Sequence, residues 1–390
     1  MKLRKRMAPT AQASVHASAN AGQADGHSAR FSKLPAWAWI LYLIAGLSVL
    51  LYVAMRCSTA FADFFNLRVS SLVRAILAHL TGWIPFSLAE GLLLASPLFA
   101  IAVIAYAVKH CCDSWRATRN FLFSILAVGS LMFSLFVWSF GAGYYGVPIS
   151  EKLELDGTPP TAEELYDTLQ YVIERIEEER QNVRYDSENF SILPMSFSEM
   201  NRSLLDAYDV LHEEYPFVQR LHSSVKNVIL STPMSYTHIT GVYTFFTGEA
   251  NLNVNFPDYS LPFTAAHELA HQRGIAKEDE ANFIAYLVCI RSEDAYIRYS
   301  GYLNLYEYLA SALRRADSSL YEQARSSLPI AVRAELTAYA NFFDRYEGSV
   351  ASTLSSTVND TYLKSQGTQG SVSYGLVVRL AVAYYRDRSS

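Results

Sequence analysis

The sequence contains few cysteines and few charged residues. Its 390 residues include four cysteines, and Cys289 is the only one after residue 112. A domain formed by the C-terminal part therefore cannot be cross-linked by disulfides of its own. Only 18% of the residues are charged and 51% are hydrophobic, which is more apolar than an average soluble protein. This balance favours contact between part of the chain and a lipid bilayer.

An excess of positive charge is also lacking. The formal net charge is -5 and the isoelectric point is near 6.0. The sequence has no basic patch interleaved with aromatic residues, which is the pattern typical of nucleic-acid binding. We therefore expect no nucleic-acid partner.

Three long apolar runs occupy the first 150 residues: 36–55, 91–108 and 121–141. Each is close to the ~20 residues that a helix needs to cross a bilayer. The first run is preceded by 35 residues, and its apolar core exceeds the ~7–15 residues usual in a signal peptide. The sequence therefore predicts a three-helix transmembrane anchor that begins with a retained signal-anchor.

The positions of lysine and arginine predict the orientation of this anchor. Basic residues concentrate before the first run and between the second and third runs, which places both segments in the cytoplasm. The loop between the first two runs carries three arginines, which weakens the asymmetry without reversing it. The basic residues of the cytoplasmic segments are Lys2, Arg4, Lys5, Arg6, Arg30, Lys33, Lys109, Arg116 and Arg119.

Three regions follow from these patterns. Residues 1–33 are expected to be a disordered cytoplasmic tail, because most of this segment has almost no large apolar side chains. Residues 34–146 form the three-span anchor, and residues 147–390 form an extracytoplasmic domain. Within the anchor, the amphipathic pieces of residues 56–87 predict either a helix at the outer membrane surface or a packed loop.

The C-terminal domain is predicted to be mainly helical, with one small sheet. Thr161 and Glu164 have the spacing of a capping box at the start of an amphipathic helix. Further helical patterns cover residues 198–215, 278–346 and 374–385. The domain is therefore of the α+β class.

A strand pattern lies just upstream of the most informative motif. In EANLNVNF, residues 249–256, apolar side chains alternate with Asn251, Asn253 and Asn255, as in a strand with one buried face. The preceding GVYTFF followed by TGE predicts the partner strand of a hairpin. Either the asparagines face a cleft and the strand edge binds an extended peptide, or the strand is an ordinary half-exposed one.

The motif itself is AAHELAHQRGIAKEDEANF, residues 265–283. A helix from about Leu261 to Arg273, stopped by Gly274, places His267 and His271 one turn apart on one face, where both imidazoles can bind one metal ion. Glu268 lies beside them. It can act on a water without being a ligand.

A catalytic zinc takes three protein ligands and leaves one position open. On a second helix after Gly274, Glu278 shares a face with two alanines and with Asn282, which is placed to support a ligand histidine. Glu280 is the alternative third ligand, and the helix phase favours Glu278.

This arrangement resembles the gluzincin metallopeptidases, in which HExxH is followed by a glutamate ligand on a second helix. The resemblance implies a zincin-like fold, Zn²⁺ held by His267, His271 and Glu278, and Glu268 as general base. Two departures are visible. Asn282 replaces the usual aspartate, and only six residues separate His271 from Glu278.

The three spans, TGEAN, LPFTAAHELAHQRGIAKEDEANF and SYGLVVRL together resemble a family of bacterial membrane proteins known as domain of unknown function 3810. The resemblance implies this architecture in the bacterial cytoplasmic membrane and no substrate. Five side chains are weaker candidates for stabilising an oxyanion: Tyr243, Tyr259, Tyr374, His238 and Arg379.

These observations predict a membrane-anchored zinc metallopeptidase. Glu268 would be the general base, and the substrate would be a peptide or protein of the cell envelope. Two alternatives remain: a non-catalytic zinc-binding receptor or scaffold, closed by a fourth ligand such as Asp279 or His238, and a zinc amidase acting on a cell-wall polymer.

Overall fold

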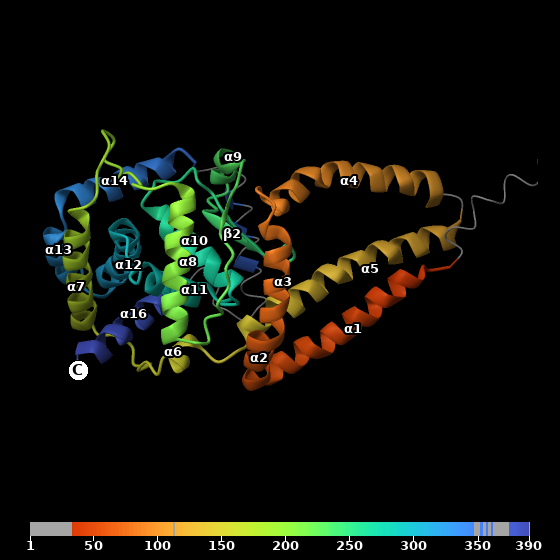
Figure 1. Ribbon diagram of the computed structural model, residues 1–390, viewed down its shortest axis with the longest axis horizontal. Helices are drawn as coiled ribbons and strands as arrows, with labels where there is room; N and C mark the ends of the chain where they lie inside the picture. Colours follow the sequence, from red (N-terminus) through yellow and green to blue (C-terminus); the bar gives the residue numbers. More distant parts are fainter. Residues whose placement is uncertain are drawn as a thin grey trace, which may run out of the picture. The chain divides into compact units, whose positions relative to one another are not determined.

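The computed structural model describes residues 33–111, 114–346, 352–353, 356–357, 360–361 and 374–389 (Figure 1). The predicted tail lies outside this range except for Lys33. The chain is mostly helical with one small sheet. It divides into two compact units. One comprises the chain up to Leu47 and Leu94–Ser134, and the other comprises Ser48–Leu93 and Leu135–Ser390.

Three helices of the described chain are long and apolar enough to cross a membrane: α1 (Ala36–Cys57), α4 (Leu88–Cys111) and α5 (Trp115–Ser139). The apolar stretch of each has a mean hydropathy of 2.2. They coincide with the three runs predicted from the sequence. The prediction of three apolar helices of spanning length is confirmed.

The second unit begins well before residue 147, where the sequence suggested a boundary. The chain between α1 and α4 forms α2 (Thr59–Phe65), the π-helix η2 (Asn66–Ser70) and α3 (Ser71–Gly82). Helix α3 buries Arg74, Ala78 and Thr81 on one face, and the Thr81 hydroxyl donates to the Thr247 carbonyl at 3.2 Å. This connecting segment is therefore part of the globular unit.

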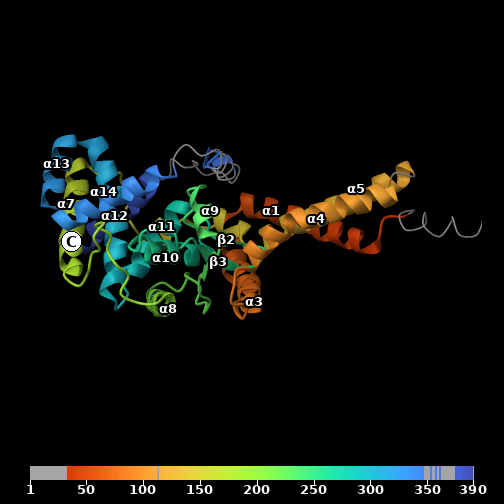
Figure 2. The same cartoon turned by 90° about the horizontal axis from the view of Figure 1, so that it is seen from above.

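Two adjacent helices, α10 (Ser260–Gln272) and α11 (Glu278–Cys289), form the centre of the second unit. They pack on each other and on α12 (Ala295–Ala316), which also packs on α7 (Ala162–Arg180) (Figure 1). Helix α8 (Phe197–Glu214) contacts both α10 and α11. Figure 2 shows the same unit from above. Nearly every residue of α10 and α11 is buried.

The remaining helices surround this core. The capping box predicted at Thr161 and Glu164 is present at the start of α7. The other helices are η3 (Gly141–Tyr144), α6 (Ile149–Lys152), α9 (Ser231–Ser235), α13 (Ser318–Ser327), α14 (Ile330–Asp344) and α16 (Tyr374–Ser389).

The sheet has three short strands in the order β1-β3-β2. They are β1 (Lys226–Asn227), β2 (Gly241–Thr244) and β3 (Glu249–Leu252). Strands β2 and β3 form the predicted antiparallel hairpin, and β1 pairs with β3 in parallel. The hairpin leads into α10, against which both of its strands pack.

Neither alternative for this strand is correct, because β3 has no open edge and all four of its residues are buried. β3 is the central strand, and Asn251 and Asn253 are 1% and 0% exposed. The backbone N–H of Asn253 donates to the Thr240 carbonyl at 2.9 Å, and its side-chain amide donates to Ser235 Oγ and the Ile239 carbonyl. An alternation of polar and apolar residues does not show whether the polar side chains face water or are buried with hydrogen bonds to other protein groups.

Candidate metal centre

The centre is built on α10. Its C-terminus follows the predicted motif, because Gly274 adopts φ +89, a left-handed conformation that ends the helix. The N-terminal half of α10 is fixed by Ser300 Oγ, which accepts from the Phe263 N–H at 3.1 Å. In the next turns, Tyr208 donates from α8 to the Ala266 carbonyl at 2.5 Å. The histidine-bearing turns therefore lie in a rigid, buried environment.

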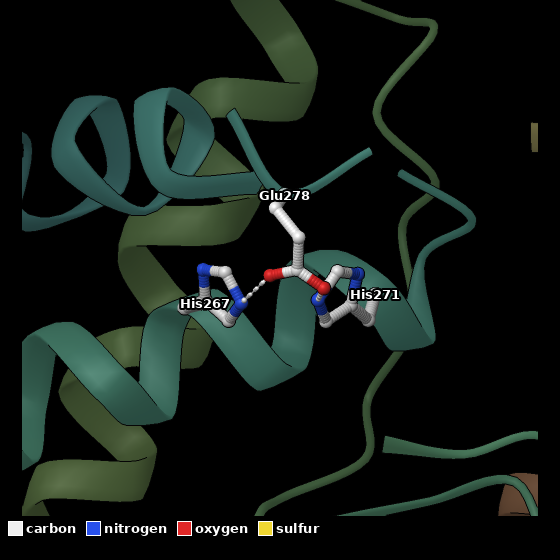
Figure 3. Close-up of side chains that lie close together, drawn as sticks. All are labelled: His267, His271 and Glu278. Atoms are coloured by element: carbon white, nitrogen blue, oxygen red, sulfur yellow. Dashed lines mark ion pairs between the residues drawn. The ribbon is translucent and has the colours of Figure 1, made fainter. Parts of the chain in front are cut away.

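The structure brings together His267, His271 and Glu278. One potential ligand atom from each residue lies within 4.8 Å of the others. Glu278 Oε2 is 3.2 Å from His267 Nε2, and Glu278 Oε1 is 3.6 Å from His271 Nε2. Figure 3 shows the carboxylate between the two imidazoles, reached from the start of α11 while both histidines project from α10.

His271 has a fixed ring orientation. Its Nδ1 lies 2.7 Å from the Ile275 carbonyl oxygen. A carbonyl accepts only from an N–H, so Nδ1 carries a proton and Nε2 faces Glu278. Asn282 was expected to support a ligand histidine in this way, but the Ile275 carbonyl takes that role for His271. Asn282 instead lines the adjoining cavity.

The close approach of these groups strongly perturbs the protonation of His271 and Glu278. Burial lowers the pKa of His271, but the neighbouring Glu278 and Glu268 carboxylates outweigh burial and raise it to about 9. Burial alone would raise the pKa of Glu278. The two histidines reverse this and hold it well below its ordinary value. The anionic carboxylate of Glu278 is therefore held between two imidazoles. The same set of three side chains suits a bound metal cation.

Glu268 points toward the sheet. A Cβ placed on Gly241 of β2 would lie 2.6 Å from both the Cγ and Oε1 atoms of Glu268. The backbone of Tyr243 also lies near enough to this carboxyl group to lower its pKa slightly. Burial raises the pKa of Glu268, and the nearby Glu278 adds to this effect. Glu268 is thus a desolvated carboxyl group that the edge strand holds beside the histidines.

Three buried polar atoms at this centre have no hydrogen-bond partner among the described residues: His267 Nδ1, Glu268 Oε2 and the Tyr243 hydroxyl. Buried polar atoms are rarely left in this condition. All three residues line one cavity of about 930 Å³. The unpartnered atoms are the feature expected where a ligand, an ion or ordered water completes the site.

The cavity extends from β2 to α12 and α14. Its described lining combines aromatic rings, such as Phe140, Phe263 and Tyr308, with hydroxyl and amide groups, such as Thr264 and Asn282. It includes two carboxylates, those of Glu268 and Glu278, and no lysine or arginine. Apart from the cluster of His267, His271 and Glu278 and the carboxylate of Glu268, its described walls are therefore mostly uncharged.

Residues from the segment between α1 and α4 support the turn that joins the histidines to Glu278. The Asn66 side chain donates to the Gly274 carbonyl at 3.0 Å, and Arg74 donates to the Arg273 carbonyl at 3.3 Å. Arg74 is fully buried, and burial lowers its pKa to about 10. Its cationic group stabilises the carbonyl end of α10. No local pattern in the sequence predicts this contact, because the partners are about 200 positions apart.

The other candidates occupy different places. Glu280 Oε1 accepts from the Ile149 N–H at 3.1 Å and from Lys277 Nζ at 3.2 Å, so its carboxylate fixes the start of α6. The Tyr259 hydroxyl donates to Glu307 at 3.1 Å. His238 lines the cavity, and its Nε2 is 3.1 Å from the Tyr346 carbonyl oxygen.

Tyr243 also lines the cavity, with its hydroxyl unpartnered among the described residues. Arg379 is exposed on α16. The side chain of Tyr374 lies outside the described residues. Of the five oxyanion candidates, Tyr243 is therefore the one whose described hydroxyl is buried and unpartnered in a residue that lines the same cavity as the histidines.

Comparison with known proteins gives one match. The model of a family described as "Protein of unknown function (DUF3810)" matches residues 65–382. No curated protein and no solved structure matches the chain. The matched segment contains α10, α11 and all of the described cavity lining.

Proposed function

The chain belongs to the DUF3810 family of proteins of unknown function, and from the geometry of its centre we propose that it is a membrane-anchored zinc metallopeptidase with a zincin-like catalytic domain. One observation carries the proposal. His267, His271 and Glu278 converge within 4.8 Å at the wall of a cavity, with the carboxylate of Glu268 beside them. A His₂Glu set that leaves a fourth position open is typical of catalytic zinc.

The donor chemistry fits zinc. Two imidazole nitrogens and one carboxylate oxygen are ligands that Zn²⁺ accepts, and the Ile275 carbonyl fixes one imidazole in the way common for zinc-binding histidines. When bound, zinc supplies a Lewis acid that polarises a carbonyl and makes a neighbouring water more acidic. The unpartnered Nδ1 of His267 can bind a water or a substrate group in the cavity.

Glu268 is suited to move the proton. Its buried carboxyl group has a raised pKa, which brings it closer to the neutral range where a general base works best. It accepts a proton from the attacking water and returns that proton to the departing amine. Its contact with Gly241 and the Tyr243 backbone keeps it oriented. The Tyr243 hydroxyl is available to stabilise the oxygen of the tetrahedral carbon.

The edge strand supports a peptide substrate. The Asn253 N–H donates to the Thr240 carbonyl. Hydrogen-bonded and non-hydrogen-bonded residues alternate along an antiparallel pair, so the backbone N–H and C=O groups of Val242 point toward β3 and those of Gly241 and Tyr243 point away from it. Gly241 and Tyr243 also line the cavity. An extended peptide can add to such an edge. This favours a peptide over a cell-wall polymer.

The alternative of a closed, purely structural zinc site needs a fourth protein ligand. Within the described chain the ligand cluster contains three residues, and neither Asp279 nor His238 belongs to it. His238 faces Phe343 and the Tyr346 carbonyl instead. The geometry thus favours a catalytic centre.

The test uses the full chain in detergent micelles, because Asn66 and Arg74 contribute to the centre. Zinc content is measured by elemental analysis, and cleavage of a broad peptide library is followed by mass spectrometry. The wild type should bind one zinc per chain and cleave the library. Glu268→Gln should keep zinc and lower turnover at least ~100-fold. Equal cleavage by both proteins would refute the mechanism.

A further inference from the structure

The wall of the cavity begins where an apolar helix ends. Helix α5 ends at Ser139, and the next residue, Phe140, lines the cavity together with Tyr144. The Phe140 ring lies 5.9 Å from the His271 ring and 5.2 Å from the Tyr243 ring. Phe140, the first residue after a candidate membrane span, is therefore in ring contact with His271, a proposed zinc ligand.

The segment after α5 also packs on the turn between the proposed ligands. A Cβ placed on Gly143 would lie 2.5 Å from the Gly274 carbonyl oxygen and 2.9 Å from the Ala276 Cβ. Only glycine permits so close an approach of backbone to backbone. The turn that connects His271 to Glu278 is thus packed directly against η3, the segment that follows α5.

The length of α5 limits how far this contact can lie from lipid. The helix has 25 residues, which at ~1.5 Å per residue gives about 37 Å, compared with a hydrocarbon core of about 30 Å. A span of this length ends in the headgroup layer. Phe140 and the residues next to it therefore lie at the membrane surface.

The ends of the other two candidate spans belong to the same unit as the centre. At the start of α4, the backbone N–H groups of Leu88 and Ala89 donate to the Glu249 carboxylate of β3 at 3.0 and 2.9 Å. In α1, Ser48 accepts from the Trp138 indole at 3.1 Å. The contacts at the start of α4 and just after α5 thus hold the sheet and the centre at two span ends, and the Ser48–Trp138 hydrogen bond joins α1 to the end of α5.

Helix α3 adds an apolar surface. The face opposite Arg74 exposes Leu72, Ile76, Leu80 and Trp83, which are 62%, 50%, 62% and 79% exposed. The helix lies in the short connection between α1 and α4, so both of its ends are tied to candidate spans. An apolar stripe that ends in tryptophan is typical of a helix lying in the membrane interface. We assign the lipid surface as the occupant of this face.

We infer that the centre acts on polypeptides that are themselves anchored in the same membrane, at a bond close to the lipid surface. This inference rests on the proposed peptidase function. From the membrane surface at Phe140 to the centre, the ring contact and two side-chain lengths amount to a path of roughly 10–20 Å. An extended chain advances about 3.3 Å per residue. The cleaved bond therefore lies about three to six residues from the membrane segment of the substrate. The open edge of β2 receives that extended stretch.

The test compares two substrate libraries on the full chain in phosphatidylethanolamine–phosphatidylglycerol vesicles. One library carries a randomised segment of about 30 residues after a transmembrane helix, and the other is the same segment without the helix. Shared anchoring raises the rate by effective concentration alone, so the position of cleavage is the decisive measurement. Cuts in the anchored library should concentrate within about six residues of the helix, whatever the local sequence.

Three outcomes are distinguishable. Cuts near the helix that Glu268→Gln abolishes would support the inference. Cuts spread evenly along the anchored segment, with the free library also cleaved, would overturn the inference and leave the peptidase function standing. Cleavage of neither library by the zinc-loaded wild type would overturn both.

The lipid contact of α3 has a separate measurement. In vesicles with brominated acyl chains, the wild type should lose more tryptophan fluorescence than Trp83→Phe, because bromine quenches an indole that lies in the interface. Equal quenching in the two proteins would overturn the assignment of this face to lipid.

Discussion

The carboxyl group of Glu268 fills the space in front of Gly241, where a Cβ would lie 2.6 Å from its Cγ and Oε1 atoms. The general base proposed for the reaction is thus positioned by a residue that has no side chain. The pair links α10 to the edge strand.

Gly241→Ala should displace Glu268 and lower turnover by about 10–100-fold, because a misplacement near 1 Å is enough for a loss of this size. Zinc content should stay at one per chain, since Glu268 is not a proposed ligand. Gly157→Ala is the matched control, because nothing lies within 4 Å of a Cβ at that position. An unimpaired Gly241→Ala protein would show that the position of Glu268 does not limit catalysis.

Glu278→Ala should weaken zinc binding by more than the ~10–100-fold typical for loss of a group that merely supports a ligand. Glu280→Ala should keep zinc. It should lower the free energy of unfolding by about 1–3 kcal/mol, because the buried Ile149 N–H loses its acceptor. Competition with a chelator and thermal unfolding measure the two effects. The reverse pattern would make Glu280 the ligand.

Glu307 should make stability depend on pH. Burial raises its pKa from 4.5 to about 7, although the hydrogen bond from Tyr259 acts in the opposite direction. The folded state therefore holds this proton more tightly than the unfolded state. The resulting stability is fully present below about pH 4.5 and is lost as the pH rises toward 7.

The loss amounts to up to roughly 3 kcal/mol. Glu307→Gln cannot titrate and should remove this part of the pH dependence in thermal unfolding between pH 5 and pH 8. Identical pH profiles for the wild type and the variant would contradict a raised pKa at Glu307.

Asn253→Pro should prevent folding. The substitution removes the backbone donor to Thr240 and two side-chain hydrogen bonds inside the unit, each worth about 1 kcal/mol net and more where a partner is left buried and unpaired. Val254→Ala, at a partly exposed neighbouring position, should fold normally. Circular dichroism and size exclusion distinguish the two. A folded proline variant would contradict a requirement for the Asn253 hydrogen bonds in the fold.

The proposed orientation follows from the basic residues near the spans. In a background without the native cysteines, a membrane-impermeant thiol reagent applied to intact cells should label Pro160→Cys and miss Asn20→Cys. Lysed cells, in which both should react, provide the control. The opposite labelling would place the centre in the cytoplasm.

Local patterns in the sequence were sufficient for much of the fold. The three apolar helices, the capping box of α7, the hairpin and the end of α10 at Gly274 each depend on neighbouring residues, whose periodicity or backbone conformation is readable. The same holds for the shared helix face of His267 and His271. Helix geometry alone brings their rings to within 4.5 Å.

Contacts between distant segments were not predictable in this way. Asn66 and Arg74 read as part of a membrane loop, although they support the turn at Gly274. The asparagines of β3 read as solvent-facing because alternation does not distinguish water from backbone carbonyls as hydrogen-bond partners. Gly241 gave no signal, since its role is to leave room for a carboxyl group that comes from another element.

The short turn between α10 and α11 has a consequence for how the protein acquires metal. All three proposed ligands lie within residues 267–278, so closing the loop between them loses little chain entropy even in an unfolded chain. Unfolded protein should then retain measurable zinc affinity, and zinc should raise the melting temperature less than its affinity for the native state implies. The ligand set is also complete once residue 278 has been synthesised, before α12, α14 and α16 exist to enclose it.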